Sequence, residues 1–456
     1  MENVFNQSIW GDEGFSAILS MKPVPDILKI ISRDTSPPLW NILEHFAFQA
    51  FGTSEIVIRG LSFTFFLIAV LFTYKIGSVL FSRKTGLIAA LFTFLNPFFF
   101  TYAFEGRMYS ILAAGVTASM YFYIKMFFGE GGKSTRIGYI IATLWALYSH
   151  HFAIFAIFLQ GFWWLYEFLL GRRQTAIKVF KAFLLIGLGY LPWIYPLYTQ
   201  TKMVGGGFWL GTPTLTDLRN LIYDYLAEGI KDNSLQLPFL RISLYHASLY
   251  IVSATFVLRK WWKNISKTLF LLLWFLGPIA LTWAVSQRFQ SIFFNRYLLY
   301  TIPAAMLILV SSRSKLSIIS LAILAIFFGT IDYQYFTHPT KLPFREYSAY
   351  VKSNLKEGDF LINWNSKSHH LWETKYYGIP APIYIPPTGG ELPFFVGTAL
   401  MEKNDLIKEI PKNTKRVGVV TSGPIDEIVL PGYTEMEAKT FGDLKFVWYG
   451  KNEKNL

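Results

Sequence analysis

Residues 55 to 80 read EIVIRGLSFTFFLIAVLFTYKIGSVL, a run of mostly Phe, Leu, Ile and Val with only three charged side chains. A helix needs roughly 20 apolar residues to cross a bilayer, because each residue advances it by about 1.5 Å. This stretch therefore predicts a membrane-spanning helix, and comparable stretches along the chain predict about ten. The predicted spans are Glu55–Leu80, Gly86–Ala103, Met108–Phe128, Ile137–Ser149, His151–Leu170, Lys178–Thr199, Arg241–Leu258, Lys267–Val285, Arg296–Val310 and Lys315–Ile331.

Composition supports the same class of protein. Of the 456 residues, 53% are hydrophobic and only 16% are charged, which is too few charges for the surface of a soluble chain of this length. The formal charge of +13 could indicate nucleic-acid binding, but the Lys and Arg residues lie between apolar spans, so we expect no nucleic-acid partner. Cysteine is absent, which excludes disulfides, thiolate metal sites and cysteine nucleophiles.

Basic side chains mark alternate connections between the predicted spans. Cytoplasmic loops of membrane proteins are enriched in Lys and Arg. This rule puts residues 104–109, residues 150–151, the long loop 200–241 and the tail beyond Asp332 on the outside, together with the N-terminal segment. The basic residues assigned to the cytoplasm are Lys75, Arg83, Lys84, Lys125, Lys133, Arg136, Arg172, Arg173, Lys178, Lys181, Arg259, Lys260, Lys263, Lys267, Arg313 and Lys315.

The predicted outside position of the first 52 or so residues raises a question about how they reach it. An outer N-terminal segment of this length normally follows a span that delivers it, and the given sequence has no such span before Met1. Either this short segment crosses unaided, or the chain as given begins one helix late. We favour the second explanation.

Three regions are predicted. Residues 1–54 form an extracytoplasmic first loop, in which apolar residues at helical spacing after Asp26 are typical of helices lying in the membrane interface. Residues 55–335 form the transmembrane domain, with the outer loop 200–241. Residues 336–456 have a different composition and predict a small extracytoplasmic α/β domain. Its predicted elements are a helix at Arg345–Leu355 and strands at Asp359–Trp364, Arg416–Thr421 and Leu444–Tyr449.

Several carboxylates are predicted to lie at the outer membrane face. Asp12 and Glu13 are adjacent in the first loop, and Asp34 follows in the same segment. Glu105 lies in a connection of a few residues, just before Arg107. Carboxylates near apolar surface are costly, so their shared placement favours a functional role. The structural alternatives are a solvated loop for the acidic pair and, for Glu105 and Arg107, a local ion pair at two helix ends.

Cationic and histidine side chains occur in the same outer connections: Arg107, His150, His151, Arg288 and Arg296. The guanidinium group carries a fork of donors that matches phosphate oxygens, so these positions indicate a phosphate-bearing ligand. Alternatively, Arg288 and Arg296 extend to the interface as ordinary anchors, and the paired histidines are satisfied interfacial side chains. Four other histidines, His246, His338, His369 and His370, have no recognisable motif around them.

Five short motifs occur in order between residues 8 and 310. They are Trp10-Gly11-Asp12-Glu13-Gly14, Asp34-Thr35-Ser36-Pro37-Pro38-Leu39-Trp40, Glu105-Gly106-Arg107-Met108-Tyr109, Leu147-Tyr148-Ser149-His150-His151-Phe152, and Asn295-Arg296-Tyr297-Leu298 followed by Pro303. Together they resemble the GT-C superfamily of membrane glycosyltransferases, in particular the protein O-mannosyltransferase-like branch that includes the aminoarabinose transferases. Two features depart from that pattern: Ser36 stands where the family has His, and the span that precedes the acidic pair is missing.

This resemblance implies a polyprenyl-phosphate sugar donor and a single inverting displacement by an acceptor hydroxyl. Asp12 is expected to be the general base, with Glu13 orienting the acceptor or a metal and Glu105 as the second carboxylate. No metal ligands are assigned, although two acidic groups permit Mg²⁺ or Mn²⁺ without requiring it. The residues expected to bind substrate are Asp34, Arg107, Tyr109, His150, Arg296 and Tyr297.

The implied function leaves the substrates open. The sugar is a hexose or a pentose, and the acceptor is a glycan, a lipid or a protein. The expected location is the plasma membrane, with membrane lipids around the spans and with the active site and C-terminal domain outside. The alternative is a secondary transporter or lipid flippase, but such proteins often have internal repeats and polar groups near the bilayer midplane, and neither is evident here. A scaffold role is a third possibility.

Overall fold

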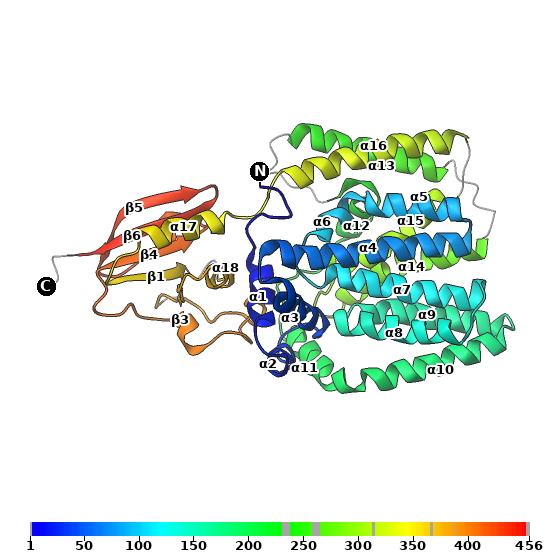
Figure 1. Ribbon diagram of the computed structural model, residues 1–456, viewed down its shortest axis with the longest axis horizontal. Coiled ribbons are helices and arrows are strands. Elements are labelled where there is room, and N and C mark those ends of the chain that lie inside the picture. Colours follow the sequence, from blue (N-terminus) through cyan, green and yellow to red (C-terminus); the bar gives the residue numbers. More distant parts are fainter. Residues whose placement is uncertain are drawn as a thin grey trace. The chain divides into compact units, whose positions relative to one another are not determined.

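The computed structural model of the chain describes residues 2–229, 238–257, 265–311, 315–364, 368–387 and 389–452 (Figure 1). The chain divides into two compact units. We call the first the head–tail unit, because it combines Met1–Asp34 and Asn41–Ile58 with Pro339–Leu456. The second, the membrane unit, contains Thr35–Trp40 and Arg59–His338.

The membrane unit is helical. Each of the ten predicted spans contains a helix, and the first span matches its predicted bounds. Among the described residues, five helical stretches are long and apolar enough to cross a membrane, or six if one bent pair is counted as a span. The helices are α4 (Glu55–Leu80), α5 (Arg83–Phe94), α6 (Pro97–Ala103), α7 (Tyr109–Phe128), α8 (Lys133–Ser149), α9 (Ala153–Leu169), α10 (Arg173–Tyr190), α11 (Ile194–Gly205), α12 (Leu215–Tyr223), α13 (Pro238–Val257), α14 (Ile265–Ser286), α15 (Ile302–Val310) and α16 (Lys315–Thr337).

Two predicted spans are wrong as continuous helices. The span Gly86–Ala103 is divided into α5 and α6, which meet at an angle of 66°. Pro97 has no amide hydrogen to continue α5, and the Asn96 side chain caps α6 by accepting from the Phe99 amide at 3.0 Å. The span Arg296–Val310 is an α-helix only from Ile302, with Pro303 in its first turn. Residues 295–301 form the short 3₁₀ turns η3 (Asn295–Tyr297) and η4 (Leu299–Thr301).

The outward surface of these helices is apolar. Large hydrophobic side chains such as Leu87, Ile141, Phe158 and Leu188 are more than half exposed. A surface of this kind is stable when lipid chains cover it. The helix content and this surface confirm the prediction of a multi-pass membrane fold.

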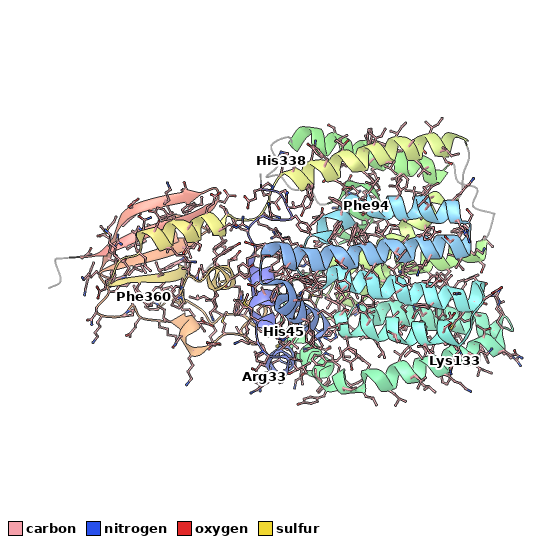
Figure 2. All side chains as sticks on the ribbon, viewed as in Figure 1. Arg33, His45, Phe94, Lys133, His338 and Phe360 are labelled. Carbon is pink, nitrogen blue, oxygen red and sulfur yellow. The ribbon has the colours of Figure 1, made fainter. Side chains whose placement is uncertain are left out.

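The two ends of the membrane unit carry different connections. Lys133, at the start of α8, lies at one end of the helices, and His338, after α16, lies at the other (Figure 2). This separation agrees with the alternation that the basic residues predict. Four basic residues used in that prediction lie outside the described residues: Arg259, Lys260, Lys263 and Arg313.

The tail of the head–tail unit forms a mixed sheet. Its strand order is β3-β2-β1-β4-β6-β5, with parallel pairing from β3 to β4 and antiparallel pairing of β6 with β4 and β5 (Figure 1). The predicted helix and the three predicted strands are all present, so the small α/β domain is confirmed. The elements are α17 (Phe344–Asn354), β1 (Asp359–Trp364), α18 (His370–Tyr376), β2 (Ile383–Tyr384), β3 (Leu406–Ile407), β4 (Arg416–Thr421), β5 (Tyr433–Phe441) and β6 (Leu444–Lys451).

Both faces of this sheet are covered by apolar side chains. On one face, Phe344 and Val351 of α17 pack with Leu361, Val420 and Phe446 from three strands. The other face has a separate core. Its buried members include Ile362, Val417, Val419, Leu430 and Val447. Burial on both faces explains why β1 and β4 are strongly apolar in sequence.

The N-terminal segments and the tail share one core. The head contributes α1 (Gly11–Ser20), α2 (Val24–Ile31) and most of α3 (Leu39–Phe51). Ile9, Ala17, Phe48 and Ile58 form a buried cluster against which Tyr376 of the tail packs. The helices predicted after Asp26 are therefore present, and within this unit the head packs against the C-terminal domain.

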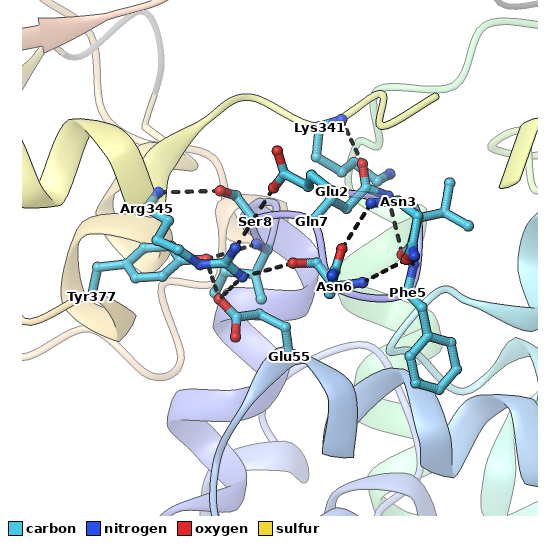
Figure 3. Close-up of polar contacts among 12 residues, drawn as sticks. Glu2, Asn3, Phe5, Asn6, Gln7, Ser8, Glu55, Lys341, Arg345 and Tyr377 are labelled. Atoms are coloured by element: carbon cyan, nitrogen blue, oxygen red, sulfur yellow. Dashed lines mark hydrogen bonds and ion pairs between the residues drawn. The ribbon is translucent and has the colours of Figure 1, made fainter. Parts of the chain in front are cut away.

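Polar contacts reinforce this union of head and tail (Figure 3). The Arg345 guanidinium lies 2.8 Å from a Glu55 oxygen, which also accepts from the Tyr377 hydroxyl at 2.8 Å. The Gln7 side-chain oxygen accepts two tail amides, those of Thr340 and Lys341, at 2.8 and 3.0 Å. Within this unit the two ends of the sequence are thus held together by charge-assisted hydrogen bonds as well as by apolar packing.

A buried ion pair predicts that the sheet is sensitive to acid. The Arg416 guanidinium donates two hydrogen bonds to the Asp359 carboxylate, at 2.9 and 2.6 Å. Its central carbon lies 4.2 Å from the ring centre of Trp448. Burial alone would raise the pKa of Asp359, but the Arg416 hydrogen bonds and charge outweigh it, so this pKa lies below 3.8. The Asp359 carboxyl therefore binds a proton more readily in the unfolded state than in the folded state. The ion pair with Arg416 stabilises the fold above pH 3.8, and this stabilisation is lost as the pH falls through the lowered pKa of Asp359.

We expect Asp359→Asn to destabilise the sheet by about 1.5–3 kcal/mol at neutral pH, the usual contribution of hydrogen bonds to a charged group. Hydrogen exchange of the β1 and β4 amides measures this as faster exchange than in the wild type. The difference should shrink once the pH lies below the folded-state pKa. Glu357→Gln, at an exposed site just before β1, is the matched control. Equal exchange in Asp359→Asn and wild type would contradict the prediction.

Candidate functional site

Glu105 and Arg107 lie in the short connection between α6 and α7. Their backbones are linked, because the Arg107 amide donates to the Glu105 carbonyl at 2.7 Å. The connection is held at its far side by Ser110, whose hydroxyl donates to the Tyr102 carbonyl at 3.0 Å. These bonds fix the backbone positions from which both charged side chains project.

Arg296 lies in η3, directly before α15. The Asn295 side chain accepts the Arg296 amide at 2.7 Å, and the Asn295 carbonyl accepts the hydroxyl of Tyr225. Tyr225 belongs to a π-helical turn, η2 (Asp224–Glu228). The side-chain amide of Asn96, at the start of α6, donates to the Tyr225 carbonyl. The turn that carries Arg296 is thus fixed to the helix that precedes Glu105.

These two connections meet in an ion pair. An Arg296 nitrogen lies 3.5 Å from a Glu105 oxygen, and the two side chains are only 15% and 10% exposed. The guanidinium carbon lies 4.9 Å from the ring centre of Phe294 and 5.2 Å from that of Tyr109. Aromatic rings exclude water around the charge, which strengthens its interaction with any anion that enters.

His150, between α8 and α9, completes this cluster. Its ring lies 4.9 Å from that of Tyr297 and 6.3 Å from that of Tyr109. Its Nδ1 accepts the Phe152 amide at 3.1 Å, which assigns the ring proton to Nε2 as a donor. Burial lowers the pKa of His150 well below 6.5, and the neighbouring His151, Arg107 and Arg296 lower it further.

His151 points to a different partner. Its Nε2 lies 2.6 Å from the Gln200 side-chain oxygen, and Gln200 in turn donates to the Ser36 carbonyl at 3.4 Å. Burial lowers the pKa of His151 to about 4, although the Gln200 hydrogen bond opposes that shift. Both histidines are therefore neutral at physiological pH, and the segment with Ser36 is tied to the same connection.

We call the group Glu105, Arg107, Tyr109, His150, Arg296 and Tyr297 the cationic cluster. Two guanidinium groups and one carboxylate give it a formal charge of +1. With an imidazole N–H donor and aromatic walls, it can bind a phosphate and stabilise negative charge that develops on an oxygen. Arg288, another candidate, has an exposed side chain and is not part of the cluster.

The other three predicted site residues belong to the head–tail unit. Asp12 is in the first turn of α1 and is partly exposed. Glu13 is fully buried and accepts the Trp10 amide at 3.4 Å, so it helps to begin the helix. Asp34 follows α2 and is 6% exposed. The idea that the acidic pair is a solvated loop is wrong, because both residues are helical.

Two tail residues were missed from the sequence. His370 Nδ1 lies 2.8 Å from a Glu373 oxygen, and His370 Nε2 lies 2.9 Å from the Ser422 hydroxyl. The available signal was the i, i+3 spacing of His370 and Glu373, which puts both on one side of a helix. Without knowing that residues 370–376 are helical, this spacing carried no information.

Within the described ranges, no three His, Cys, Asp or Glu side chains converge in a way that could hold a metal ion.

The fold is that of a multi-pass helical membrane protein with a small C-terminal sheet domain, as the sequence predicted. No family model and no curated protein matches the chain. Among solved structures, it is similar to ArnT from Cupriavidus metallidurans in the apo state, with a TM-score of 0.65 and 11% identity over 97% of this chain and 94% of that one.

Two further structures share the fold. ArnT from the same organism bound to undecaprenyl phosphate has a TM-score of 0.59 and 12% identity, over 98% of this chain and 96% of that one. An oligosaccharyltransferase from Archaeoglobus fulgidus, in a complex with Zn and sulfate, has a TM-score of 0.50 and 12% identity. That match covers 84% of this chain and 59% of the oligosaccharyltransferase. At these identities the likeness concerns the fold.

Proposed function

We propose that this chain is a glycosyltransferase that moves a sugar from a polyprenyl-phosphate carrier to an acceptor hydroxyl. The observation that carries the proposal is the cationic cluster, in which Arg296 and Arg107 lie beside a neutral His150 and a single carboxylate. A buried positive site suits a phosphate that gains charge as its bond to the sugar breaks. The bound undecaprenyl phosphate of one ArnT structure with this fold supports the choice of carrier.

The proposed reaction is one inverting displacement. The acceptor oxygen forms a bond to the anomeric carbon while the bond from that carbon to the phosphate oxygen breaks. The acceptor proton goes to the Asp12 carboxylate, and the electron pair of the broken bond leaves on the phosphate. Arg107, Arg296 and the Nε2–H of His150 hold the phosphate oxygens. Because phosphate leaves as a stable anion, no acid is needed to protonate it.

The remaining candidates have supporting roles. Glu105 fixes the Arg296 guanidinium through the ion pair, and Tyr109 and Tyr297 form the walls around it. We propose that Asp34 contacts the substrate. We also propose that Glu13 orients the acceptor by fixing the first turn of α1. The site and the C-terminal domain are assigned to the extracytoplasmic side of the plasma membrane, on the evidence of the basic connections.

The test uses the full chain in proteoliposomes with a panel of polyprenyl-phosphate hexoses and pentoses. Glycolipids, glycans and peptides serve as acceptors. The expected result is release of polyprenyl phosphate together with a glycosylated acceptor whose anomeric configuration is inverted. Movement of a solute or lipid across the bilayer, without release of polyprenyl phosphate from any donor, would overturn the proposal in favour of a transporter.

A further inference from the structure

Residues 206–214 join α11 to α12 without forming a helix or a strand, and we call them the outer strap. Side chains at the end of α14 hold one end of it. The Trp283 indole N–H donates to the Thr214 carbonyl at 3.1 Å, and the Gln287 side-chain amide donates to the Pro213 carbonyl at 2.8 Å. The Thr214 hydroxyl also caps α12, so this end of the outer strap is anchored to two helices.

The middle of the outer strap is held on both sides of Trp209. The Gln290 side-chain nitrogen, which carries two N–H donors, donates to the carbonyls of Phe208 and Leu210, each at 3.2 Å. The backbone around Trp209 is therefore fixed, yet its indole ring is 49% exposed. Ordering a loop costs conformational entropy, and a half-exposed ring offsets only part of that cost by burial. A fixed but open aromatic ring is preorganised to bind a ligand.

Trp209 adjoins the cationic cluster through Phe294. The two rings meet edge to face, with 5.0 Å between their centres. The centre of the Phe294 ring lies 4.9 Å from the guanidinium carbon of Arg296 and 5.3 Å from the centre of the Tyr297 ring. The centre of the Trp209 ring thus lies within about 10 Å of that guanidinium carbon, the largest value that these distances allow. Phe294, Arg296 and Tyr297 are all partly exposed, so the cluster is open to a ligand on this side.

A donor bound at the cationic cluster would bring its sugar close to the Trp209 ring. Only one oxygen bridges the phosphate and the anomeric carbon, so a phosphate held by Arg296 keeps the sugar beside the aromatic side chains around that guanidinium. One face of a sugar ring presents mainly C–H groups, and these groups are attracted to the negative face of an aromatic ring. Indole offers the largest such face among the side chains.

Two other contacts could use an exposed tryptophan. The polyprenyl tail is apolar along its length, and tryptophan is also enriched at the membrane–water interface as an anchor. The tail runs from the phosphate into the bilayer, where the lipid-facing helices meet it. The outer strap belongs instead to the long loop that the basic residues assign to the outside, which is where the sugar leaves the bilayer. This placement favours the sugar as the partner of Trp209.

We infer that Trp209 is the platform on which the sugar ring of the donor stacks, with Gln290 as its positioning residue. The inference deepens the proposed function and rests on its polyprenyl-phosphate sugar donor. It divides the donor between neighbouring side chains: the cationic cluster binds the phosphate, and Trp209 binds the sugar. A change at Trp209 should therefore alter recognition of the sugar and leave recognition of the phosphate unaltered.

The test measures dissociation constants of the full chain in nanodiscs for two ligands that differ only in the sugar. One is free polyprenyl phosphate, and the other is the polyprenyl-phosphate hexose or pentose that the wild type binds most tightly. We expect Trp209→Ala to weaken binding of the sugar-bearing donor roughly 3- to 10-fold, the usual contribution of an aromatic contact beyond its buried area. Binding of free polyprenyl phosphate should stay unchanged. Equal weakening for both ligands would assign the ring to the phosphate or the tail, and no weakening for either would make it an interfacial anchor; both results overturn the inference.

Two more variants at the same position separate the aromatic face from apolar bulk. Trp209→Phe keeps a smaller ring and should retain most of the donor affinity, whereas Trp209→Leu should lose as much as Trp209→Ala. These two variants keep the comparison available if Trp209→Ala does not fold, and similar affinities in both would contradict a stacking contact. Phe289→Ala is the matched control, because it removes an aromatic side chain that is 75% exposed in the connection before η3. It should leave both dissociation constants unchanged.

Gln290→Leu tests the positioning role with a readout apart from binding. Leucine has a similar size but cannot donate to the carbonyls of Phe208 and Leu210. Hydrogen exchange of a peptide covering residues 206–214 should therefore speed up, and donor affinity should fall part of the way toward that of Trp209→Ala. Faster exchange with wild-type donor affinity would overturn the role of Gln290.

The sugar contact and the proposed transfer can fail separately. If the wild type binds the sugar-bearing donor more tightly than free polyprenyl phosphate, Trp209→Ala removes that difference and no donor gives transfer, the proposed function fails and the sugar contact stands. If the wild type binds both ligands equally, the inference about Trp209 fails whether or not sugar is transferred.

Discussion

Asp12→Asn is expected to lower the rate of sugar transfer by about 10²–10⁴-fold, the usual contribution of a general base. Asparagine has nearly the same shape as aspartate but cannot take the acceptor proton. Because Asp12 is partly exposed in the first turn of α1, the fold should persist. The measurement is release of polyprenyl phosphate from a labelled donor, alongside binding of that donor, which should be retained.

Asp26→Asn is the matched control for this change. Asp26 is exposed in the first turn of the neighbouring helix α2, so its replacement removes the same favourable charge at a helix start, worth about 0.3–1 kcal/mol. We expect Asp26→Asn to keep wild-type turnover. Full turnover in Asp12→Asn would show that the base is another group, and loss in both variants would point to stability of the head helices instead.

Arg296→Gln is expected to lower kcat by about 10²–10³-fold, the usual cost of removing one donor that stabilises developing negative charge. Inhibition by free polyprenyl phosphate should weaken in the same variant, because the product carries the group that Arg296 holds. Arg296→Lys should recover only part of the activity, since an ammonium keeps the charge and loses the planar fork. Arg288→Gln, at an exposed site in the connection that leads to η3, should have no effect.

A double variant separates chemistry from folding. Arg296→Gln alone removes the positive charge that lies beside the buried Glu105 carboxylate, which by itself destabilises the protein. Arg296→Gln with Glu105→Gln removes both charges and relieves that cost. If the double variant regains wild-type turnover, Arg296 has only a structural role. We expect it to regain thermal stability while its turnover stays low.

Much of the fold followed from local patterns in the sequence. Long apolar runs such as residues 55–80 permit few structures other than a spanning helix. Strands β1 and β4 are buried on both faces, so each is a short apolar run that stands out from the polar residues around it. The edge strand β5 was missed because nearly all of its side chains are exposed, which removes the alternation that marks a strand. The break at Asn96 and Pro97 was visible, but the apolar residues on both sides outweighed it.

The candidate site shows a similar division. Residues in short connections between long helices, such as Glu105 and Arg107, could be assigned to one membrane face from topology alone. The contact of Arg296 with Glu105 could not be predicted, because it joins positions far apart in the sequence. The close packing of Gly11 and Gly14 against His369 and Trp372 was equally hidden, since it joins the first and last parts of the chain.

The head–tail unit draws on residues that precede the spans and on residues that follow them. A ribosome makes Asp12 before the membrane helices and Glu373 after them, so α1 can reach its docked position only when synthesis is nearly complete. Chains that stall or are clipped before the tail emerges therefore lack the surface on which α1 packs. The head helices complete their unit only after every preceding membrane helix has been made.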